Sequence, residues 1–346
     1  MKEKVVIAQI GCGYWGPNLV RNFSSLKNCV VKYVVEASPE RRLFVEENYS
    51  KTEAIAEVQT VWNDSTVDAV IIATPAATHH SLARQALEHG KHVFVEKPLA
   101  MSVTEADELA ALAATRRLTL MVGHTFLYNP AVRYAKTLVE RGELGEIYYI
   151  YSQRLNLGRV RSDVNAWWNL APHDISILLY LMGDEPPTTV SAKGIDYIQK
   201  GIEDVVFASL IWPNRIMAHI HVSWLDPGKV RKMILVGSQK MVVYDDVSDD
   251  KIAIVDKGID RIPKAIESMD YDDFNNFQLF HRAGSVLLPK IDFKEPIWLE
   301  ASHFIECVKT GRVPLTGPEH AKKVIAVLEA GQASLRTGQT MKVDLA

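Results

Sequence analysis

The most constraining feature of the sequence is a glycine-rich turn between a predicted strand and a predicted helix. Residues 5–10 form a β-branched run suited to a strand covered on both faces, and they lead directly into Gly11-Cys12-Gly13-Tyr14-Trp15-Gly16. Pro17 suits the first turn of a following helix. The backbone amides of such a turn can face the pyrophosphate of a dinucleotide. This stretch therefore predicts a dinucleotide-binding unit.

An acidic residue ends the next predicted strand. Residues 30–35 form a second β-branched run, and Glu36 follows it 20 residues after Gly16. A carboxylate at this point accepts hydrogen bonds from the adenosine ribose and repels the 2′-phosphate of NADP. We therefore expect NAD(H) to be preferred over NADP(H), although Arg41 lies close enough in the sequence to soften this discrimination.

Strands and helices continue to alternate up to residue 124. This alternation predicts an α/β fold with a doubly wound parallel (Rossmann) sheet, so we place a dinucleotide-binding domain at residues 1–124. Its further predicted elements are strands at 68–73, 92–95 and 118–122 and helices at 81–88 and 104–116, the last with Thr104 as a possible N-cap.

Strands dominate after residue 128. Residues 125–346 are expected to form an α+β substrate-binding and oligomerisation domain with a large, mainly antiparallel sheet. The predicted elements include strands at 147–153, 188–197, 205–212, 216–223, 230–236 and 241–244 and terminal helices at 297–310 and 318–337. The last helix can pack on either domain.

Few predicted helices are available to cover both faces of this second sheet. One face is therefore expected to meet a second copy of the chain in a homodimer or homotetramer. The expected contributors are Trp212, Trp224, His219 and His221.

Composition excludes several classes of function. The 39 basic and 42 acidic residues give a formal charge of −3, so no global basic field would recruit nucleic acid or an acidic membrane surface. No apolar run approaches membrane-spanning length, and neither export nor anchoring is expected. The three cysteines are too few and too scattered for a disulfide framework or a zinc site, which favours the cytoplasm.

Lys97 follows the predicted strand at residues 92–95, in the segment Glu96-Lys97-Pro98. Ligands of open α/β sheets bind outside the carboxyl ends of the strands, so a lysine there can meet a bound substrate. On position alone, a solvated lysine before a turn is the commoner outcome.

Together these segments resemble the glucose-fructose oxidoreductase, inositol dehydrogenase and MocA-like (Gfo/Idh/MocA) family of nicotinamide-dependent oxidoreductases. The resemblance is carried by the glycine turn, by Ala73-Thr74-Pro75 with His79, and above all by Glu96-Lys97-Pro98. It implies that Lys97 is the catalytic-site lysine. It also implies that the cofactor is contacted by Gly11, Gly13, Tyr14, Trp15, Gly16, Glu36, Arg41, Thr74, Pro75, His79, Glu96 and Lys97.

The family's second motif is an aspartate followed four residues later by a histidine, and here those positions hold Asn169 and His173. The surrounding segment, Trp168 to Asp174, resembles a branch associated with bacterial surface-sugar biosynthesis. That likeness implies a nucleotide-linked sugar as substrate. Because Asn169 cannot titrate, it either orients the substrate or His173, or it is a packing substitution.

His173 is expected in the first turn of a helix, because Pro172 and Asp174 are first-turn residues and an apolar stripe follows them. The positive end of that helix would disfavour imidazolium, leaving a neutral base that accepts the proton of a sugar hydroxyl while cationic Lys97 stabilises the alkoxide. The alternative is a structural histidine near a helix start.

Several side chains are candidates for the substrate site, although such residues are usually solvated surface. They are Arg154, Arg159, Arg161, Trp168, Lys229 and Arg231. No metal is predicted, because His219 and His221 lack a third ligand. Two alternatives to a nucleotide-sugar dehydrogenase stay open: a dehydrogenase of a free sugar or inositol, and a non-catalytic NAD(H)-binding sensor.

Overall fold

The computed structural model describes residues 3–158, 160–263 and 277–345 of the chain. Its first sheet has six parallel strands in the order β3-β2-β1-β4-β5-β6, which confirms the predicted doubly wound fold. The strands are β1 (Val5–Ile10), β2 (Cys29–Val35), β3 (Glu53–Ile55), β4 (Ala69–Ile72), β5 (His92–Glu96) and β6 (Leu120–Gly123). Apart from the edge strand β3, they are mostly buried, as expected for a sheet covered on both faces.

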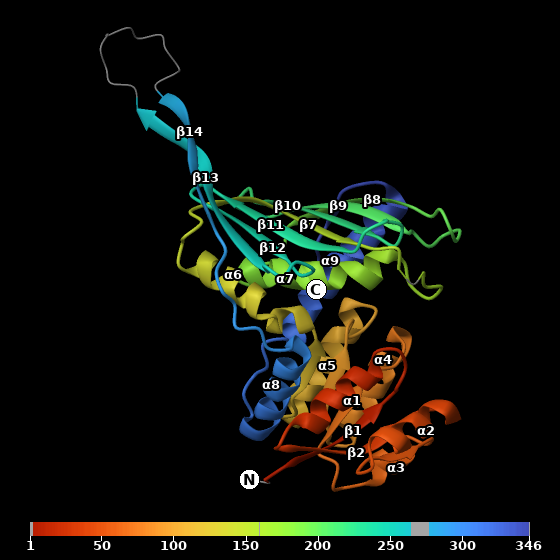
Figure 1. The fold of residues 1–346 in the computed structure, drawn as a ribbon. Helices are drawn as coiled ribbons and strands as arrows, with labels where there is room; N and C mark the ends of the chain where they lie inside the picture. The colour runs from red at the N-terminus through yellow and green to blue at the C-terminus, as the bar shows by residue number, and fades with distance from the viewer. Residues whose placement is uncertain (1–2, 159, 264–276, 346) are drawn as a thin grey trace, which may run out of the picture.

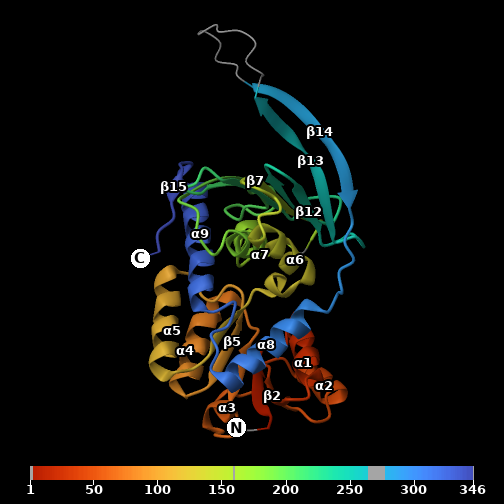
Figure 2. The ribbon, with the colours of Figure 1, turned by 90° about the vertical axis from the view of Figure 1, so that its left-hand side faces the viewer.

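Helices connect these strands on the two faces of the sheet. They are α1 (Gly16–Ser25), α2 (Pro39–Asn48), α3 (Gln59–Asn63), α4 (His79–Glu88) and α5 (Val103–Arg116). Figure 2 shows α4 and α5 on one side and α1 on the other. The N-cap of α5 is Ser102, whose hydroxyl accepts from the amide of Glu105, so the prediction of Thr104 as the cap was wrong by two residues.

The second sheet has nine strands in the order β14-β13-β12-β11-β7-β10-β9-β8-β15. Its pairs are antiparallel except β7 with β10, which confirms a mainly antiparallel α+β domain. The bounds are β7 (Ile147–Leu155), β8 (Thr189–Ile195), β9 (Val205–Ile211), β10 (Met217–Ser223), β11 (Val230–Gly237), β12 (Met241–Asp245), β13 (Ile252–Pro263), β14 (Phe277–Leu287) and β15 (Met341–Lys342).

Strands β13 and β14 were not predicted. They extend from one edge of the sheet and project away from the body of the molecule (Figure 1). Asp256-Lys257-Gly258 cuts short the apolar run at residues 252–255, and Arg282-Ala283-Gly284 interrupts the second segment, so neither segment has the continuous pattern of a long strand.

Three helices cover the inner face of the large sheet: α6 (Pro130–Glu140), α7 (Ala166–Leu181) and α9 (Pro318–Thr337). Figure 1 shows them between the two sheets, and α9 contacts both α5 and α7. Within the described ranges, no helix covers the opposite face. The chain also returns to the first sheet, because Phe304 of α8 (Pro296–Thr310) makes edge-to-face contacts with Phe23 of α1 and Phe94 of β5. The predicted division at residues 124 and 125 stays a prediction.

Two tryptophans expected at the uncovered face lie in the interior instead. Trp212 and Trp224 are each 1% exposed. The Trp224 indole donates to the Asn169 side chain on α7, and the Trp212 indole donates to the main-chain oxygen of Glu185, in the loop after α7. His219 and His221 do lie beside Phe207, and the ring centroids of His221 and Phe207 are 4.0 Å apart.

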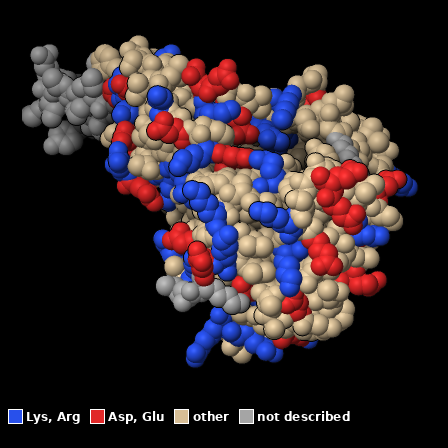
Figure 3. Space-filling model, turned by 60° about the horizontal axis from the view of Figure 1, so that its bottom comes forward, with Lys and Arg blue, Asp and Glu red and all other residues tan. Residues whose placement is uncertain are grey.

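Charges of both signs are interspersed over the face shown in Figure 3. Within residues 3–158, 160–263 and 277–345, no helix combines the length and apolar character needed to cross a membrane.

Candidate active site

Two of the three glycines in the turn are required by close backbone contacts, and the third faces open space. Gly11 has φ +90°, and a Cβ there would lie 2.6 Å from the carbonyl oxygen of Ala73. A Cβ on Gly16 would lie 2.8 Å from the carbonyl oxygen of Gly11, so this glycine lets α1 start close to β1. A Cβ on Gly13 would meet nothing within 4 Å, which leaves open space beside the turn and the N-terminus of α1. The turn therefore fits a pyrophosphate.

Glu36 lies against this turn at the end of β2. Its carboxylate accepts from the backbone amides of Cys12, at 2.7 Å, and Ser38, at 3.0 Å. Each oxygen keeps further acceptor capacity for a ribose hydroxyl. Arg41 donates to the carbonyl oxygen of Cys12, so its guanidinium lies on the same turn.

Two residues of the turn differ in their surroundings. Tyr14 is 81% exposed, whereas the Trp15 indole donates to a carboxylate oxygen of Glu96 at 2.8 Å. The turn is thereby tied to the end of β5. Burial raises the pKa of Glu96 above its ordinary value, and this outweighs the opposing effects of Lys97 and Trp15.

His79 joins the ends of β4 and β5 from below. Its Nε2 lies 2.9 Å from the carbonyl oxygen of Thr74, and its Nδ1 lies 2.7 Å from that of Pro98. Thr74 and His79 line the cavity, whereas Pro75 precedes the short helical turn Ala76–Thr78 beside it. His79 therefore ties the backbone directly after Lys97 to the segment that follows β4.

A cavity of about 450 Å³ lies between the two sheets, at the carboxyl ends of β4 and β5. The first domain contributes Trp15, Ala73, Thr74, Ala76, His79, Glu96, Lys97 and Pro98 to its lining. The second contributes Thr125, Phe126, Asn129, Arg161, Val164, Trp168, Asn169, His173, Arg231, Asp246, Phe293, Glu295, Pro296 and Ile297. The cavity brings together the lysine, the asparagine and the histidine predicted for catalysis.

Lys97 crosses from one domain to the other. Its ammonium donates to the main-chain oxygen of Asn169 at 2.8 Å. Burial lowers the pKa of Lys97, opposed by the charge of Glu96 and assisted by Arg161 and Arg154. A cation in this position can stabilise negative charge that develops on a substrate oxygen.

The helix that carries His173 begins earlier than predicted. Helix α7 starts at Ala166, where the Asn165 side chain accepts from the amide of Trp168, so Pro172 lies inside it and His173 is not in its first turn. The prediction took a first-turn proline as the start and overlooked the Asn165 cap. A proline there leaves the carbonyl of Trp168 without its helical donor.

The histidine is nevertheless held in its neutral form, for a different reason. Burial lowers the pKa of His173 well below its ordinary range, and the charges of Lys97, Arg154 and Arg231 lower it further. Its Nδ1 is buried and has no hydrogen-bond partner among the described residues. The ring packs edge-on against Phe126, with centroids 5.0 Å apart. A neutral imidazole at the cavity wall can accept a proton.

Asn169 is oriented by a residue that sequence reasoning assigned elsewhere. The Trp224 indole donates to Oδ1 of Asn169 at 3.2 Å, which presents the asparagine toward the cavity. Local sequence gave no signal for this contact, because the two residues are 55 positions apart.

The candidate substrate residues separate into two groups. Arg161, Trp168 and Arg231 line the cavity. Arg154 does not, because its guanidinium pairs with the buried carboxylate of Asp174, with Nε and Oδ2 2.6 Å apart. Lys229 is exposed and is not among the lining residues, and Arg159 lies outside the described residues.

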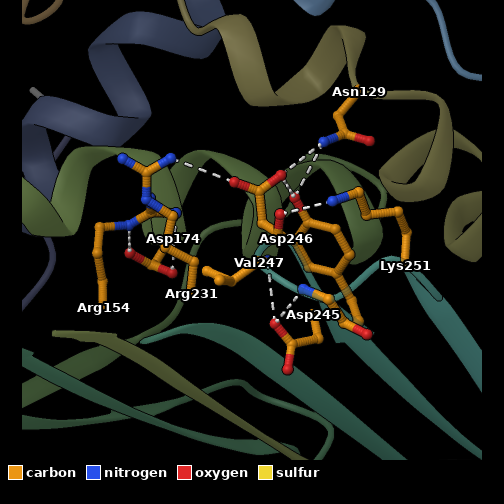
Figure 4. Close-up of polar contacts among 10 residues, drawn as sticks. Asn129, Arg154, Asp174, Arg231, Asp245, Asp246, Val247 and Lys251 are labelled. Carbon is orange, nitrogen blue, oxygen red and sulfur yellow. Dashed lines mark hydrogen bonds and ion pairs between the residues drawn. The ribbon is translucent and has the colours of Figure 1, made fainter. Parts of the chain in front are cut away.

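Figure 4 shows a polar cluster around Asp246, which lines the cavity. Arg231 and Asn129 converge on Asp246, with donor–acceptor distances of 3.2 and 3.1 Å, and the Tyr244 hydroxyl donates to the same carboxylate. This cluster was not predicted, because its members come from α6, β11 and β12 and meet only in the fold.

No group of three or more His, Cys, Asp or Glu side chains within the described part of the chain is arranged to hold a metal ion.

Comparison with known proteins places these features in a family. A sequence profile described as "Oxidoreductase family, NAD-binding Rossmann fold" matches residues 5–124, and the "GFO/IDH/MocA C-terminal domain" matches residues 132–243.

Individual relatives are distant but extensive. The scyllo-inositol 2-dehydrogenase (NAD(+)) of Bacillus subtilis is 25% identical over 82% of this chain and 80% of its own length. The UDP-N-acetylglucosamine 3-dehydrogenase of Acidithiobacillus ferrooxidans is 29% identical over 57% of this chain and 61% of its own length. The crystal structure of GenD2 from gentamicin A biosynthesis in complex with NAD has a TM-score of 0.82, with 21% identity, and covers 99% of this chain and 97% of GenD2.

Proposed function

Since the chain belongs to the Gfo/Idh/MocA family of NAD-binding oxidoreductases, we propose that it moves a hydride between nicotinamide and a secondary hydroxyl or ketone of a sugar, and that this sugar is linked to a nucleotide. The observation that carries the proposal is the convergence of Lys97 and His173 on one cavity beside the glycine turn.

The cofactor fits the residues that are present. Gly11, Gly13 and Gly16 leave room for a pyrophosphate, and Glu36 presents acceptors for the ribose. The nicotinamide supplies the hydride acceptor or donor when the cofactor is bound. We propose that NAD(H) is preferred, because the 2′-phosphate of NADP would face the carboxylate of Glu36.

The chain's own residues supply the remaining chemistry. In oxidation, neutral His173 accepts the hydroxyl proton while the ammonium of Lys97 stabilises the developing alkoxide. Asn169, held by Trp224, orients the substrate or the histidine but carries no charge. In the opposite direction the same pair protonates the reduced oxygen.

The nucleotide-linked substrate is supported by the room beside the active site. A second cavity of about 480 Å³ shares Val164 and Trp168 with the first and is lined by Gln332 and Arg336 of α9. A group attached to the sugar could occupy it, with the Arg336 guanidinium as a donor and the carboxylates of Asp163 and Glu329 as acceptors for its polar atoms. A free sugar or inositol would leave this second cavity unused.

Three experiments test these proposals. Purified protein is incubated with NAD(H) and a panel of nucleotide sugars, free aldoses and inositols while nicotinamide absorbance is followed; absence of turnover with every member would favour the sensor alternative.

Arg336→Ala should raise KM for a nucleotide sugar and leave KM for a free sugar unchanged. Titrations should show that NAD(H) binds more tightly than NADP(H). In Glu36→Ala the difference between the two dissociation constants should become smaller.

Assembly and location are proposed on separate grounds. The uncovered sheet face presents partly exposed Tyr149, Phe207 and Met217, which would suit contact with a second copy in a homodimer or homotetramer. A monomeric mass by light scattering would contradict this. We propose the cytoplasm because Cys12, Cys29 and Cys307 are all free thiols.

A further inference from the structure

A chain of hydrogen bonds leads from the middle of α7 to the protein surface. The Oγ of Ser176 lies 2.8 Å from Nε2 of His320, and Nδ1 of His320 lies 2.6 Å from a carboxylate oxygen of Asp184. Ser176 is 1% exposed and His320 is 6% exposed, whereas the side chain of Asp184 is 37% exposed. The chain of contacts therefore begins in the interior and ends at solvent.

Its inner end lies next to the proposed base. Ser176 follows His173 by three positions on α7, and side chains at this spacing are neighbours on a helix, with Cβ atoms about 5–6 Å apart. Nδ1 of His173 has no hydrogen-bond partner among the described residues, so the proton would reach the Ser176 hydroxyl through one bridging water molecule.

Oxidation creates a need for such a path. His173 takes up the hydroxyl proton of the substrate. With cofactor and substrate bound in the cavity, the side of the imidazole that faces the cavity is covered, so the proton cannot leave to solvent from that side. Burial and neighbouring cations disfavour imidazolium at this position, so the proton must leave before the site is reset. The Nδ1 of His173, which is buried and has no hydrogen-bond partner among the described residues, is the atom from which it can depart.

We propose that Ser176, His320 and Asp184 form a proton path that carries the proton accepted by His173 to solvent beside Asp184. This inference rests on the proposed dehydrogenase function.

The transfer conserves protons and requires no oxidant. The Ser176 hydroxyl takes a proton from the His173 side as it gives its own to Nε2 of His320. His320 releases its Nδ1 proton to the carboxylate of Asp184, which returns it to water. The hydroxyl and the imidazole then reorient, and reduction of a ketone uses the same steps in reverse.

The surroundings suit this role. The groups facing His320 are Ser176, Asp184 and His124, whose ring lies edge-on with centroids 5.4 Å apart. Burial raises the pKa of Asp184, but its bonds with His320 and Lys323 outweigh this and hold it below the ordinary value, so Asp184 is a carboxylate at neutral pH. A carboxylate in contact with Nδ1 favours the tautomer with its proton on Nδ1 and leaves Nε2 free to accept from Ser176.

The test separates hydride transfer from proton release. Single turnovers are followed in weak buffer by nicotinamide absorbance and, in parallel, by a pH-indicator dye, using the substrate found in the panel. In the natural protein the two signals should rise together. His320→Gln keeps hydrogen-bonding groups but cannot relay a proton. Proton release should therefore become about tenfold or more slower than hydride transfer. This effect is smaller than the 10²–10⁴-fold loss of rate expected when a general base itself is removed. Asp184→Asn should give the same lag.

Lys323→Gln is the matched control, because it removes another bond to Asp184 without interrupting the path; its two signals should stay together. Thermal melting verifies that each variant is folded. If His320→Gln does not fold, the comparison of the two signals is made with Asp184→Asn alone. In the cofactor-free protein, nitrogen NMR should find the His320 proton on Nδ1. Synchronous signals in both path variants, or a proton on Nε2, would overturn the proposal. Failure of the proposed function would instead appear as no absorbance change in the natural protein.

Discussion

Replacing Asn169 by aspartate restores the residue type that the family motif holds, and the structure predicts the consequence for the pH profile. Asn169 precedes His173 by four residues on α7, and the ammonium of Lys97 contacts its main-chain oxygen. A negative charge at this position favours the protonated forms of both groups, so Asn169→Asp should raise the pKa of His173 and of Lys97.

The size of the shift follows from Coulomb's law. At about 6 Å and an effective dielectric constant of about 20, a unit charge contributes about 2.8 kcal/mol, or roughly two pKa units. Burying the new carboxylate opposes this by raising its own pKa, so we expect a shift of about one unit.

The direction in which each limb of the pH profile moves follows from the protonation state that oxidation requires of His173 and Lys97. Oxidation needs neutral His173, so the acid limb of kcat/KM should move to higher pH. It also needs cationic Lys97, whose pKa burial lowers to about 8, so the alkaline limb should move upward as well. Relative to the natural protein, activity in Asn169→Asp should fall at the acid end of the profile and persist further above pH 8.

Asn169→Ala is the matched control for this experiment. It removes the contact with Trp224 without adding charge, so the maximum should fall while both limbs stay in place. The assay is the pH dependence of kcat/KM, followed by nicotinamide absorbance. Limbs that coincide in the natural protein and Asn169→Asp would refute the assignment of His173 and Lys97 to the two limbs.

The remaining predictions use the same assay or the stability of the protein. Lys97→Ala should lower turnover about a hundredfold or more with cofactor binding preserved, whereas Lys229→Ala, outside the cavity, should leave turnover unchanged. His173→Ala should lower oxidation by about two to four orders of magnitude; near-normal turnover would make it a structural histidine. Gly11→Ala should weaken NAD binding and lower the melting temperature, because its Cβ would clash with the Ala73 carbonyl at positive φ; unchanged values would contradict the steric argument.

The first domain was predictable because its signals are local. The glycine turn, the β-branched strands and the acidic residue after β2 are each written in a few consecutive residues. The same holds for Lys97, since a strand end in a parallel sheet fixes the edge at which a side chain emerges.

The second domain's contribution was less predictable because it depends on contacts distant in the sequence. An arginine that lines a cavity and an arginine that pairs with a buried carboxylate look alike in one sequence, which is why Arg231 and Arg154 were grouped together although only Arg231 reaches the cavity. Trp224 was assigned to an exterior face for the same reason: alternation in a strand gives two faces but does not say which is covered.

The chain can hold asparagine at position 169, where the family motif has aspartate, because the contact with Lys97 does not use the side chain of this residue. Lys97 donates to the main-chain oxygen of Asn169, an acceptor that every residue type provides. The side chain is fixed separately through Trp224. Exchange of aspartate for asparagine therefore changes the charge near His173 without removing the contact that positions Lys97. The neutral state of His173 in turn comes mainly from burial, which does not depend on residue 169 being charged or uncharged. A chain with asparagine at this position can thus keep both the cation and the base in place, provided that the proton taken up by His173 has another route to solvent.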